Sequence, residues 1–207
     1  MAQKKLIFFN GPPNSGKDLS ATIVGSYLRS KPGISVMQCK FADPLKLATH
    51  TLFAIPHNTS YYEAEFGNEW KNAPQPEFFG HTPREVYIAI SEEIGKRFGG
   101  SAVFGRVQLR KIKRETVANT FVFSDCGFFD EVHPLITAFG KENCLVIELR
   151  RPGTSFSNDS RGYIGDSVRT DPRTKGTVVR TIHNDNDRDL LNIQVKGAVK
   201  SFLKLEE

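Results

Sequence analysis

Apolar residues along the chain follow two alternating patterns. Short continuous apolar runs, typical of strands covered on both faces of a sheet, occur at 5–10, 34–41, 119–124, 144–149 and 178–182. Between them, apolar residues recur every three or four positions, which predicts amphipathic helices at 18–29, 44–53, 83–97, 103–115 and 129–140. A final helix is expected after a cap at Asp185 or Asp187. This alternation predicts an α/β fold, with about five parallel strands flanked by helices on both faces.

Two long connections lack either pattern. Residues 54–80 carry several prolines and a group of aromatic side chains, namely Tyr61, Tyr62, Trp70, Phe78 and Phe79. A connection of this length is usually functional, and its aromatic residues could stack on a base or form a satellite core beneath the loop. Residues 151–177 are rich in Gly, Ser, Asp and Arg, which suits either a mobile lid that excludes water or a surface loop.

The composition is that of an ordinary globular protein. A length of 207 residues suits one well-packed domain. No apolar run approaches the ~20 residues that span a bilayer, and the start Met-Ala-Gln-Lys-Lys lacks the apolar core of a signal peptide. We therefore expect no membrane association and a cytoplasmic location. The three cysteines are widely spaced, which indicates neither a zinc site nor a disulfide framework, and two of them lie in predicted strands as buried thiols.

The net charge of +5 suits an acidic partner, either nucleic acid or nucleotide phosphates. A denser basic group comprises Arg106, Arg110, Lys111, Lys113 and Arg114, which we interpret as a solvated helix face. The sequence shows no helix-turn-helix, zinc or RNA-binding signature, so stable nucleic-acid binding is not expected.

The stretch Gly11-Pro12-Pro13-Asn14-Ser15-Gly16-Lys17-Asp18 carries the clearest chemistry. It joins a predicted strand to a predicted helix, and Gly-x-x-x-x-Gly-Lys in that context is a phosphate-binding loop. Its backbone amides and Lys17 would cradle a polyphosphate at the start of the helix. Asp18 stands where a Ser or Thr usually binds magnesium; it could hold the ion through water, or simply favour the helix dipole.

Other candidate residues follow predicted strands or begin predicted helices. Asp125 ends an apolar strand, the Walker B pattern of a magnesium-organising carboxylate. Lys46 lies near the end of the second strand, where α/β sheets bind ligands, although a surface lysine fits equally. Thr82-Pro83-Arg84-Glu85 has the form of a capping box. Arg84 would lie in the first turn, where the dipole disfavours a cation, so an anionic ligand or a surface ion pair is expected beside it.

Taken together, these motifs resemble the P-loop deoxynucleoside monophosphate kinases of bacteriophages and, more distantly, the animal phosphomevalonate kinases. The resemblance covers most of the chain. Its residues are Ser15-Gly16-Lys17-Asp18, the run from Phe41 to Lys46, Thr82 to Glu85, Phe121 to Asp125 with Glu131, Val146 to Gly153, and Ile182-His183-Asn184. Leu19 stands where these kinases often have Thr, and Cys126-Gly127-Phe128-Phe129 departs from their usual Asp-x-Arg-Phe run.

The resemblance implies a phage-encoded enzyme that supplies DNA precursors by transferring the γ-phosphoryl group of ATP, with Mg²⁺, to a deoxynucleoside 5′-monophosphate. It implies a P-loop NTPase three-layer fold of the nucleoside monophosphate kinase type. The single domain of 207 residues would comprise a core (1–53, 116–150, 178–207), an acceptor-binding region (54–115) and a mobile lid (151–177). Homodimer formation stays open.

The implied site has four groups of residues. ATP would be bound by Gly11, Pro13, Asn14, Ser15, Gly16, Lys17, Asp18 and Asn184; the metal by Asp18 and Asp125; the acceptor by Lys46, Arg84, Arg97 and Trp70. Lys17, Arg150, Arg151 and Arg161 would stabilise the charge in transfer. Two alternatives remain: another small-molecule kinase of the phosphomevalonate type, and a P-loop NTPase that acts on nucleic acid.

Overall fold

The structure is a computed structural model that describes residues 3–56, 61–62, 65, 69–157, 159–185 and 187–206. Its contacts divide the chain into two compact units. The first unit comprises Met1–Phe41 and Gly105–Glu207, and the second comprises Ala42–Phe104. The helix that follows the second strand therefore groups with the second unit and not with the sheet.

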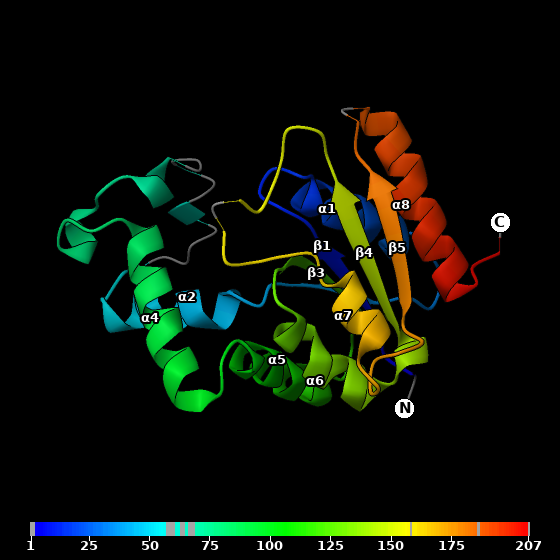
Figure 1. The fold of residues 1–207 in the computed structure, drawn as a ribbon, viewed down its shortest axis with the longest axis horizontal. Helices are drawn as coiled ribbons and strands as arrows, with labels where there is room; N and C mark the ends of the chain where they lie inside the picture. Colours follow the sequence, from blue (N-terminus) through cyan, green and yellow to red (C-terminus); the bar gives the residue numbers. More distant parts are fainter. Residues whose placement is uncertain are drawn as a thin grey trace. The chain divides into compact units, whose positions relative to one another are not determined.

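Five strands in the described part of the first unit form one sheet in the order β2-β3-β1-β4-β5, with every pair parallel (Figure 1). They are β1 (Lys5–Asn10), β2 (Val36–Cys39), β3 (Thr120–Cys126), β4 (Cys144–Arg150) and β5 (Val178–His183). The predicted α/β class and parallel sheet are confirmed. β2 is shorter than predicted because it is an edge strand whose ladder to β3 starts at Val36 and stops at Cys39.

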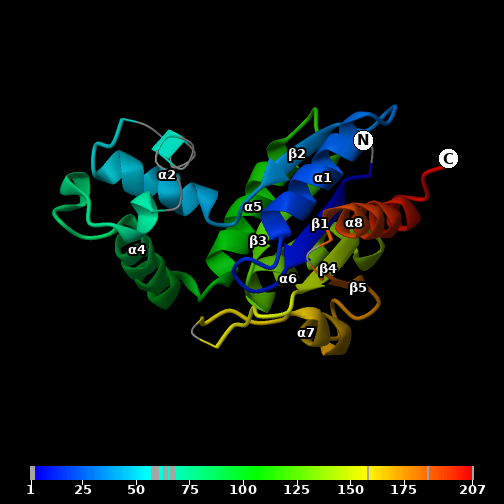
Figure 2. The same ribbon diagram turned by 90° about the horizontal axis from the view of Figure 1, so that it is seen from above.

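Helices cover both faces of this sheet (Figure 2). On one face, α1 (Lys17–Arg29) and α8 (Arg188–Leu203) pack against each other and bury alternate strand residues such as Ile7 and Phe9. On the other face lie α5 (Ala102–Arg114), α6 (Phe129–Phe139), the short helices η3 (Lys141–Asn143) and α7 (Gly165–Thr170). The rings of Phe8, Phe41 and Phe123 pack together, with Phe41 and Phe123 stacked at 4.7 Å between centroids.

The strand order creates a point where the chain changes direction across the sheet. The connection from β1 leads past β3 to β2, whereas the connection from β3 leads past β1 to β4. β1 and β3 are hydrogen-bonded neighbours, so their carboxyl ends border the crevice at which open α/β sheets bind ligands. The Gly11–Lys17 loop follows β1, and Asp125 is the next-to-last residue of β3, at that same edge.

The second unit is built around an aromatic cluster. It contains α2 (Asp43–Leu52), the short helices η1 (Trp70–Asn72) and η2 (Pro76–Phe78), and α4 (Pro83–Phe98). Its buried apolar residues are Leu45, Ile55, Tyr62, Trp70, Phe78 and Tyr87. The satellite-core interpretation is thus confirmed for Tyr62, Trp70 and Phe78, whereas Phe79 is 84% exposed. The predicted capping box at Thr82 and Glu85 is also present, with both reciprocal hydrogen bonds.

The segment 151–177 contains α7, which the sequence did not predict because six residues are too few to show a helical period. Part of the segment is fixed to the sheet. The Asn10 side chain donates to the carbonyl oxygen of Gly162 at 2.9 Å and accepts from the amide of Ile164 at 3.2 Å. Buried Glu148 accepts from the amide of Gly165 at 2.7 Å. A lid movement therefore stays a prediction for the part before Gly162.

The cap of α8, the buried cysteines and the basic face of α5 agree with the predictions from the sequence. Asp187 caps α8 through the amides of Asp189 and Leu190. Cys39 and Cys144 are buried, as expected. The five basic residues of α5 are all exposed, which supports the solvated-face interpretation. Within the described ranges, no helix has the length and apolar character needed to cross a bilayer.

Candidate active site

The loop after β1 depends on two glycines for different reasons. Gly16 has a φ of 100°, in the left-handed region, and a Cβ there would lie 2.7 Å from the Asn184 side-chain nitrogen. At Gly11, a Cβ would lie 2.7 Å from the carbonyl oxygen of Leu149. Asn14 also adopts a left-handed conformation, with a φ of 62°, which asparagine tolerates better than most residues. The sequence between these positions thus folds back sharply into α1.

Hydrogen bonds from distant segments hold the loop. The Asn184 side chain, 6% exposed, donates to the carbonyl oxygen of Ser15 at 2.9 Å. Arg151 donates from Nη1 to the carbonyl oxygen of Asn14 at 2.8 Å. Within the loop, Lys17 Nζ donates to the carbonyl oxygen of Pro12 at 2.7 Å. The residues that follow β4, the neighbour of β1, and β5, the next strand outward, therefore support the loop.

The hydroxyl of Ser15 is fully buried and makes no hydrogen bond to any described residue. An unsatisfied buried hydroxyl costs about 1–3 kcal/mol, so such groups in native proteins usually have a partner. It lies in a loop whose backbone leads into the positive end of α1. An oxyanion bound there would satisfy the hydroxyl.

Lys17 carries a positive charge at an energetic cost. Its side chain is buried, and burial together with the nearby Arg161 guanidinium lowers its pKa to about 8, against the opposing effect of Asp18 and Asp125. A negatively charged ligand would restore the preference for the ammonium form. The local electrostatics thus favour an anion beside Lys17.

Two carboxylates flank this lysine. Asp18 accepts from the Ser124 hydroxyl at 2.8 Å and lies 3.3 Å from Lys40 Nζ. Burial opposes the ionisation of Asp18, but the Lys40 charge and the Ser124 hydrogen bond outweigh it and lower its pKa. Asp125 accepts from the amide of Phe41 at 2.8 Å. Mg²⁺ typically binds one or two carboxylates together with water and phosphate oxygens, so this pair fits such an ion. The described residues include no group of three or more His, Cys, Asp or Glu suited to a metal.

The three predicted arginines differ in position. Arg151 contacts the loop directly, and Arg161 is close enough to Lys17 to affect its pKa. Arg150 instead lies over the Tyr163 ring at 4.2 Å and 3.5 Å from Glu148. The structure thus brings two of the three to the loop, Arg151 through a hydrogen bond and Arg161 through its effect on Lys17, whereas Arg150 has other partners.

Glu131 is a site residue to which the sequence assigned no role. It is 7% exposed and accepts from the amides of Gly127 and Phe128 at 3.1 and 3.2 Å. Burial and the charge of Asp125 raise its pKa to about 8 despite those two hydrogen bonds. One signal in the sequence could have indicated this residue. Glu131 is at the third position of a helix that starts just after the strand that carries Asp125.

The predicted acceptor residues all belong to the second unit. Lys46 Nζ lies 6.0 Å from the centre of the Tyr87 ring. Tyr87 follows Arg84 on α4 by three positions, about one helical turn. Exposed Arg84 donates to the Asn72 side chain at 2.8 Å, and Arg97 lies 3.9 Å from Glu93. Trp70 is 8% exposed and stacks on Tyr62 at 4.5 Å. Their contact with an acceptor stays a prediction.

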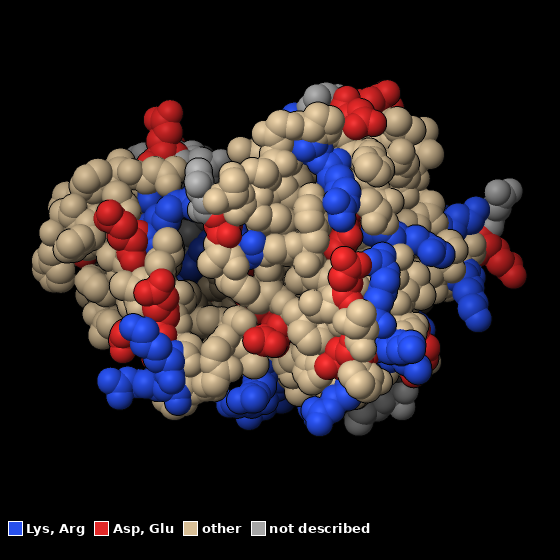
Figure 3. Space-filling view, in the orientation of Figure 1, with Lys and Arg blue, Asp and Glu red and all other residues tan. Residues whose placement is uncertain are grey.

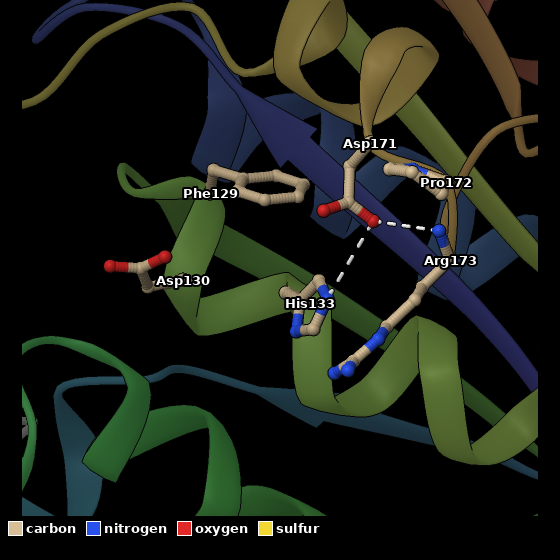
Figure 4. Close-up of a pocket in the computed structure, with 6 residues that line it drawn as sticks. All are labelled: Phe129, Asp130, His133, Asp171, Pro172 and Arg173. Carbon is tan, nitrogen blue, oxygen red and sulfur yellow. Dashed lines mark hydrogen bonds and ion pairs between the residues drawn. The ribbon is translucent and has the colours of Figure 1, made fainter.

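A separate cavity of about 430 Å³ lies between α6 and the turn after α7. Figure 4 shows its lining residues: the His133 ring lies 3.7 Å from the Asp171 carboxylate, the backbone amide of Arg173 donates to the same carboxylate at 2.8 Å, and the Arg173 side chain extends toward His133. Phe129, Asp130 and Pro172 complete the lining. None of the predicted site residues contributes to it.

Charged side chains on the face shown in Figure 3 are mixed in sign, with Lys and Arg beside Asp and Glu over the region of α7 and β5. The ion pair of Arg169 with Asp166 belongs to this surface. On this face, such mixing differs from the continuous basic stripe of a nucleic-acid footprint.

The loop between β1 and α1, the aspartate at the end of β3 and the strand order occur together. The chain has a P-loop fold.

No protein-family model and no curated protein sequence matches the chain.

Solved structures with a similar fold include two thymidylate kinases and a shikimate kinase. Thymidylate kinase from Ehrlichia chaffeensis has 13% identity and a TM-score of 0.43, over 95% of this chain and 98% of that one. Shikimate kinase from Acinetobacter baumannii has 12% identity and a TM-score of 0.42, over 99% and 97%. Thymidylate kinase from Candida albicans has 14% identity and a TM-score of 0.44, over 100% and 95%. Identities this low carry no information about the reaction.

Proposed function

We propose that the protein transfers the γ-phosphoryl group of ATP to a deoxynucleoside 5′-monophosphate and releases ADP and the diphosphate. The observation that carries this proposal is the buried Ser15 hydroxyl, which has no hydrogen-bond partner among the described residues and lies near Lys17, whose positive charge burial disfavours. A cradle of backbone amides, a hydroxyl and an ammonium at a helix N-terminus suits a polyphosphate.

The donor end of the site follows from these groups. The amides of the Gly11–Lys17 loop and the Lys17 ammonium would hold the β- and γ-phosphates. Asn184 and Arg151 act on the loop itself through the carbonyl oxygens of Ser15 and Asn14. They keep the amides directed at the phosphates before ATP arrives, which reduces the ordering cost of binding.

Asp18 and Asp125 would hold Mg²⁺, directly or through water. The ion would supply positive charge that neutralises part of the phosphate charge. The hydroxyl of Ser124 and the amide of Phe41 each engage one oxygen of these carboxylates and so fix their orientation.

The transfer step requires alignment more than covalent chemistry. The oxygens of an acceptor phosphate are already nucleophilic, so no general base is needed, and the rate depends on positioning and on charge stabilisation. Lys17, Arg151 and Arg161 would supply that charge, with Arg150 joining them if it leaves Tyr163 and Glu148. Lys46 and Arg84 would hold the acceptor phosphate, with Arg97 as a further candidate.

The test is an ADP-release assay with each of the deoxy- and ribonucleoside monophosphates, with phosphomevalonate and double-stranded DNA as further additions. We expect release that requires ATP, Mg²⁺ and at least one deoxynucleoside monophosphate. Release that depends on phosphomevalonate or on DNA instead would contradict the proposal. Lys17→Ala should abolish the acceptor-dependent release while the circular dichroism spectrum stays unchanged.

A further inference from the structure

The Asp159 carboxylate forms an ion pair with one edge of the Arg161 guanidinium. Arg161 Nε donates to the two carboxylate oxygens of Asp159 at 2.8 and 3.0 Å, and Nη2 also donates to Asp159 Oδ2. The backbone amide of Arg161 adds a bond to Oδ1 at 3.0 Å. The two side chains are 30% and 19% exposed. Two residues apart in the sequence, they form a local pair that needs no ligand.

The other edge of the guanidinium keeps N–H donors that Asp159 does not use. A guanidinium has five N–H donors, and Asp159 engages only those of Nε and Nη2. Within the described residues, Nη1 of Arg161 makes no hydrogen bond. The edge formed by Nη1 and Nη2 is the one that arginine uses to bind two phosphate oxygens at once.

Gly127 provides the surface on which the Arg161 stem lies. A Cβ at Gly127 would approach Cδ and Cγ of Arg161 to 2.2 and 2.5 Å, so no larger residue fits while Arg161 keeps this position. Gly127 also accepts from the amide of Gly162 at 3.1 Å, which fixes the residue next to Arg161. Gly127 follows Cys126, the last residue of β3, so the Walker B strand places this surface.

The surroundings of Arg161 belong to the phosphate site. Its positive charge acts on Lys17, and the carboxylates of Asp125 and Glu131 act on its own guanidinium. Asp159, Asp125 and Asp18 offset part of the repulsion between these two cations, and a phosphoryl group bound beside Lys17 would offset more of it.

We propose that Asp159 and Gly127 are positioning residues that hold Arg161 with its Nη1–Nη2 edge directed at the phosphoryl group beside Lys17. The proposal rests on the proposed function and adds the residues that prepare Arg161 for it. The pair is formed before ATP binds. The conformational entropy of the long Arg161 side chain is therefore already lost before the transfer step and does not add to its barrier.

The first test is kinetic and uses Asp159→Asn in the full chain. An amide cannot accept from both guanidinium donors, so we expect kcat to fall about tenfold, in the range of a lost positioning contact, while KM for both substrates changes less than twofold. Asp166→Asn is the matched control, because Asp166 pairs with Arg169 on the exposed side of α7 in the same segment. This control should keep the wild-type kcat.

The second test separates positioning from general stability. In an Arg161→Ala background, Asp159→Asn should cause no further loss of kcat, since the residue that it positions is gone. An equal loss with and without Arg161 would overturn the proposal. Gly127→Ala should reproduce the kcat loss, because it keeps both backbone hydrogen bonds of Gly127 and adds only the methyl group that displaces Arg161.

The third test does not depend on turnover. A ¹⁵N spectrum of the wild type should show a slowly exchanging Arg161 Nε–H, which shifts when Mg²⁺, ADP and beryllium fluoride are added as a mimic of bound ATP. Asp159→Asn should abolish the slow exchange. A fast-exchanging Nε–H in the wild type, or no shift with the mimic, overturns the positioning proposal. Absence of any monophosphate-dependent ADP release by the wild type, with the shift present, refutes only the proposed reaction.

Discussion

The side-chain amide of Asn184 donates to the carbonyl oxygen of Ser15 at 2.9 Å, although 169 positions separate the two residues. Asn184 follows β5, an edge strand, and Ser15 lies in the loop after β1. This bond links the last strand of the sheet to the turn that would bind phosphate. The shape of the loop therefore depends on a residue from the far end of the chain.

Asn184→Ala should weaken ATP binding and lower stability. The change leaves the Ser15 carbonyl oxygen without its partner, at a cost of about 1–3 kcal/mol, and it frees the loop to move. Calorimetric titration with ATP and urea unfolding measure the two effects. Asn143→Ala is the matched control, because Asn143 is also buried and donates to a carbonyl oxygen, that of Phe139, at the opposite end of the sheet. It should lose stability but keep the ATP affinity; equal losses of affinity in both variants would refute the role of Asn184.

Lys17→Met should make the ligand-free protein more stable at neutral pH. The pKa of Lys17 is lowered to about 8 in the folded state, so the unfolded chain binds more protons between pH 8 and the ordinary lysine value, and wild-type stability rises across that interval. The advantage of the Met variant should thus be largest below pH 8 and should shrink above it. Urea unfolding of both proteins at pH 7 and pH 10 checks this; an advantage that does not change with pH would contradict it.

The same lysine predicts a pH dependence of activity. In the free enzyme, kcat/KM for ATP should decline above about pH 8, as Lys17 loses its proton. Lys17→Met should in addition lose about a hundredfold or more in kcat, the magnitude expected when one charge-stabilising donor is removed. A pH profile of the wild type, recorded at constant ionic strength, provides the measurement, and a flat profile between pH 7 and pH 9.5 would exclude a titrating Lys17.

Glu131→Gln should remove a pH dependence of stability. The pKa of Glu131 is raised to about 8, so the folded state binds more protons than the unfolded state between the ordinary Glu value and pH 8. Wild-type stability should consequently fall as the pH rises through that interval. The Gln variant keeps an acceptor for the amides of Gly127 and Phe128 and should be relatively more stable at pH 8.5 than at pH 5.5. Chemical unfolding at both pH values decides, and an unchanged difference would count against a buried, proton-binding Glu131.

Trp70→Ala tests whether this residue acts in the core or on the acceptor. The indole is 8% exposed and stacked on Tyr62, so its loss should cost about 3–5 kcal/mol, as for other large-to-small core changes. Trp70→Phe should recover much of that stability and leave KM for the monophosphate nearly unchanged. A KM that rises strongly in a stable Trp70→Phe variant would show instead that the ring contacts the acceptor.

Arg84→Ala should raise KM for the monophosphate at least tenfold while KM for ATP changes little, because a lost hydrogen bond to a charged group is worth about 1.5–3 kcal/mol. Lys96→Ala, an exposed cation paired with Glu93 on the same helix, is the control and should leave both constants unchanged. Comparable increases in both KM values for Arg84→Ala would contradict the acceptor assignment.

The sequence predicted most of the fold because its strongest signals are local. The buried strands read as continuous apolar runs, and Thr82 with Glu85 marked a helix start that the structure reproduces. The Gly11–Lys17 loop was visible because its glycines and lysine are consecutive. Helix α7 was missed because it is short and polar, with Val168 as its buried apolar residue.

The contacts around the loop were harder to predict because they join distant segments. Nothing in the sequence near Gly127 shows that the stem of Arg161, 34 positions later, lies on it. The pKa of Glu131 depends on burial by surrounding segments and on the charge of Asp125, neither of which a sequence pattern gives. Such features follow from the tertiary structure, whereas helices and strands follow from local patterns of apolar residues.

The side chain of Asn10, at the end of the central strand, binds Gly162 and Ile164 on either side of Tyr163. Any closing motion of the preceding residues must therefore pivot just before this fixed pair, and Arg161 is the residue next to the pivot. A group so near a hinge sweeps only a short arc, whereas Arg151, at the other root of the same segment, is tied to Asn14. The predicted lid movement would thus be confined to the part of the segment between these two roots and would leave the charges at the phosphate site almost stationary.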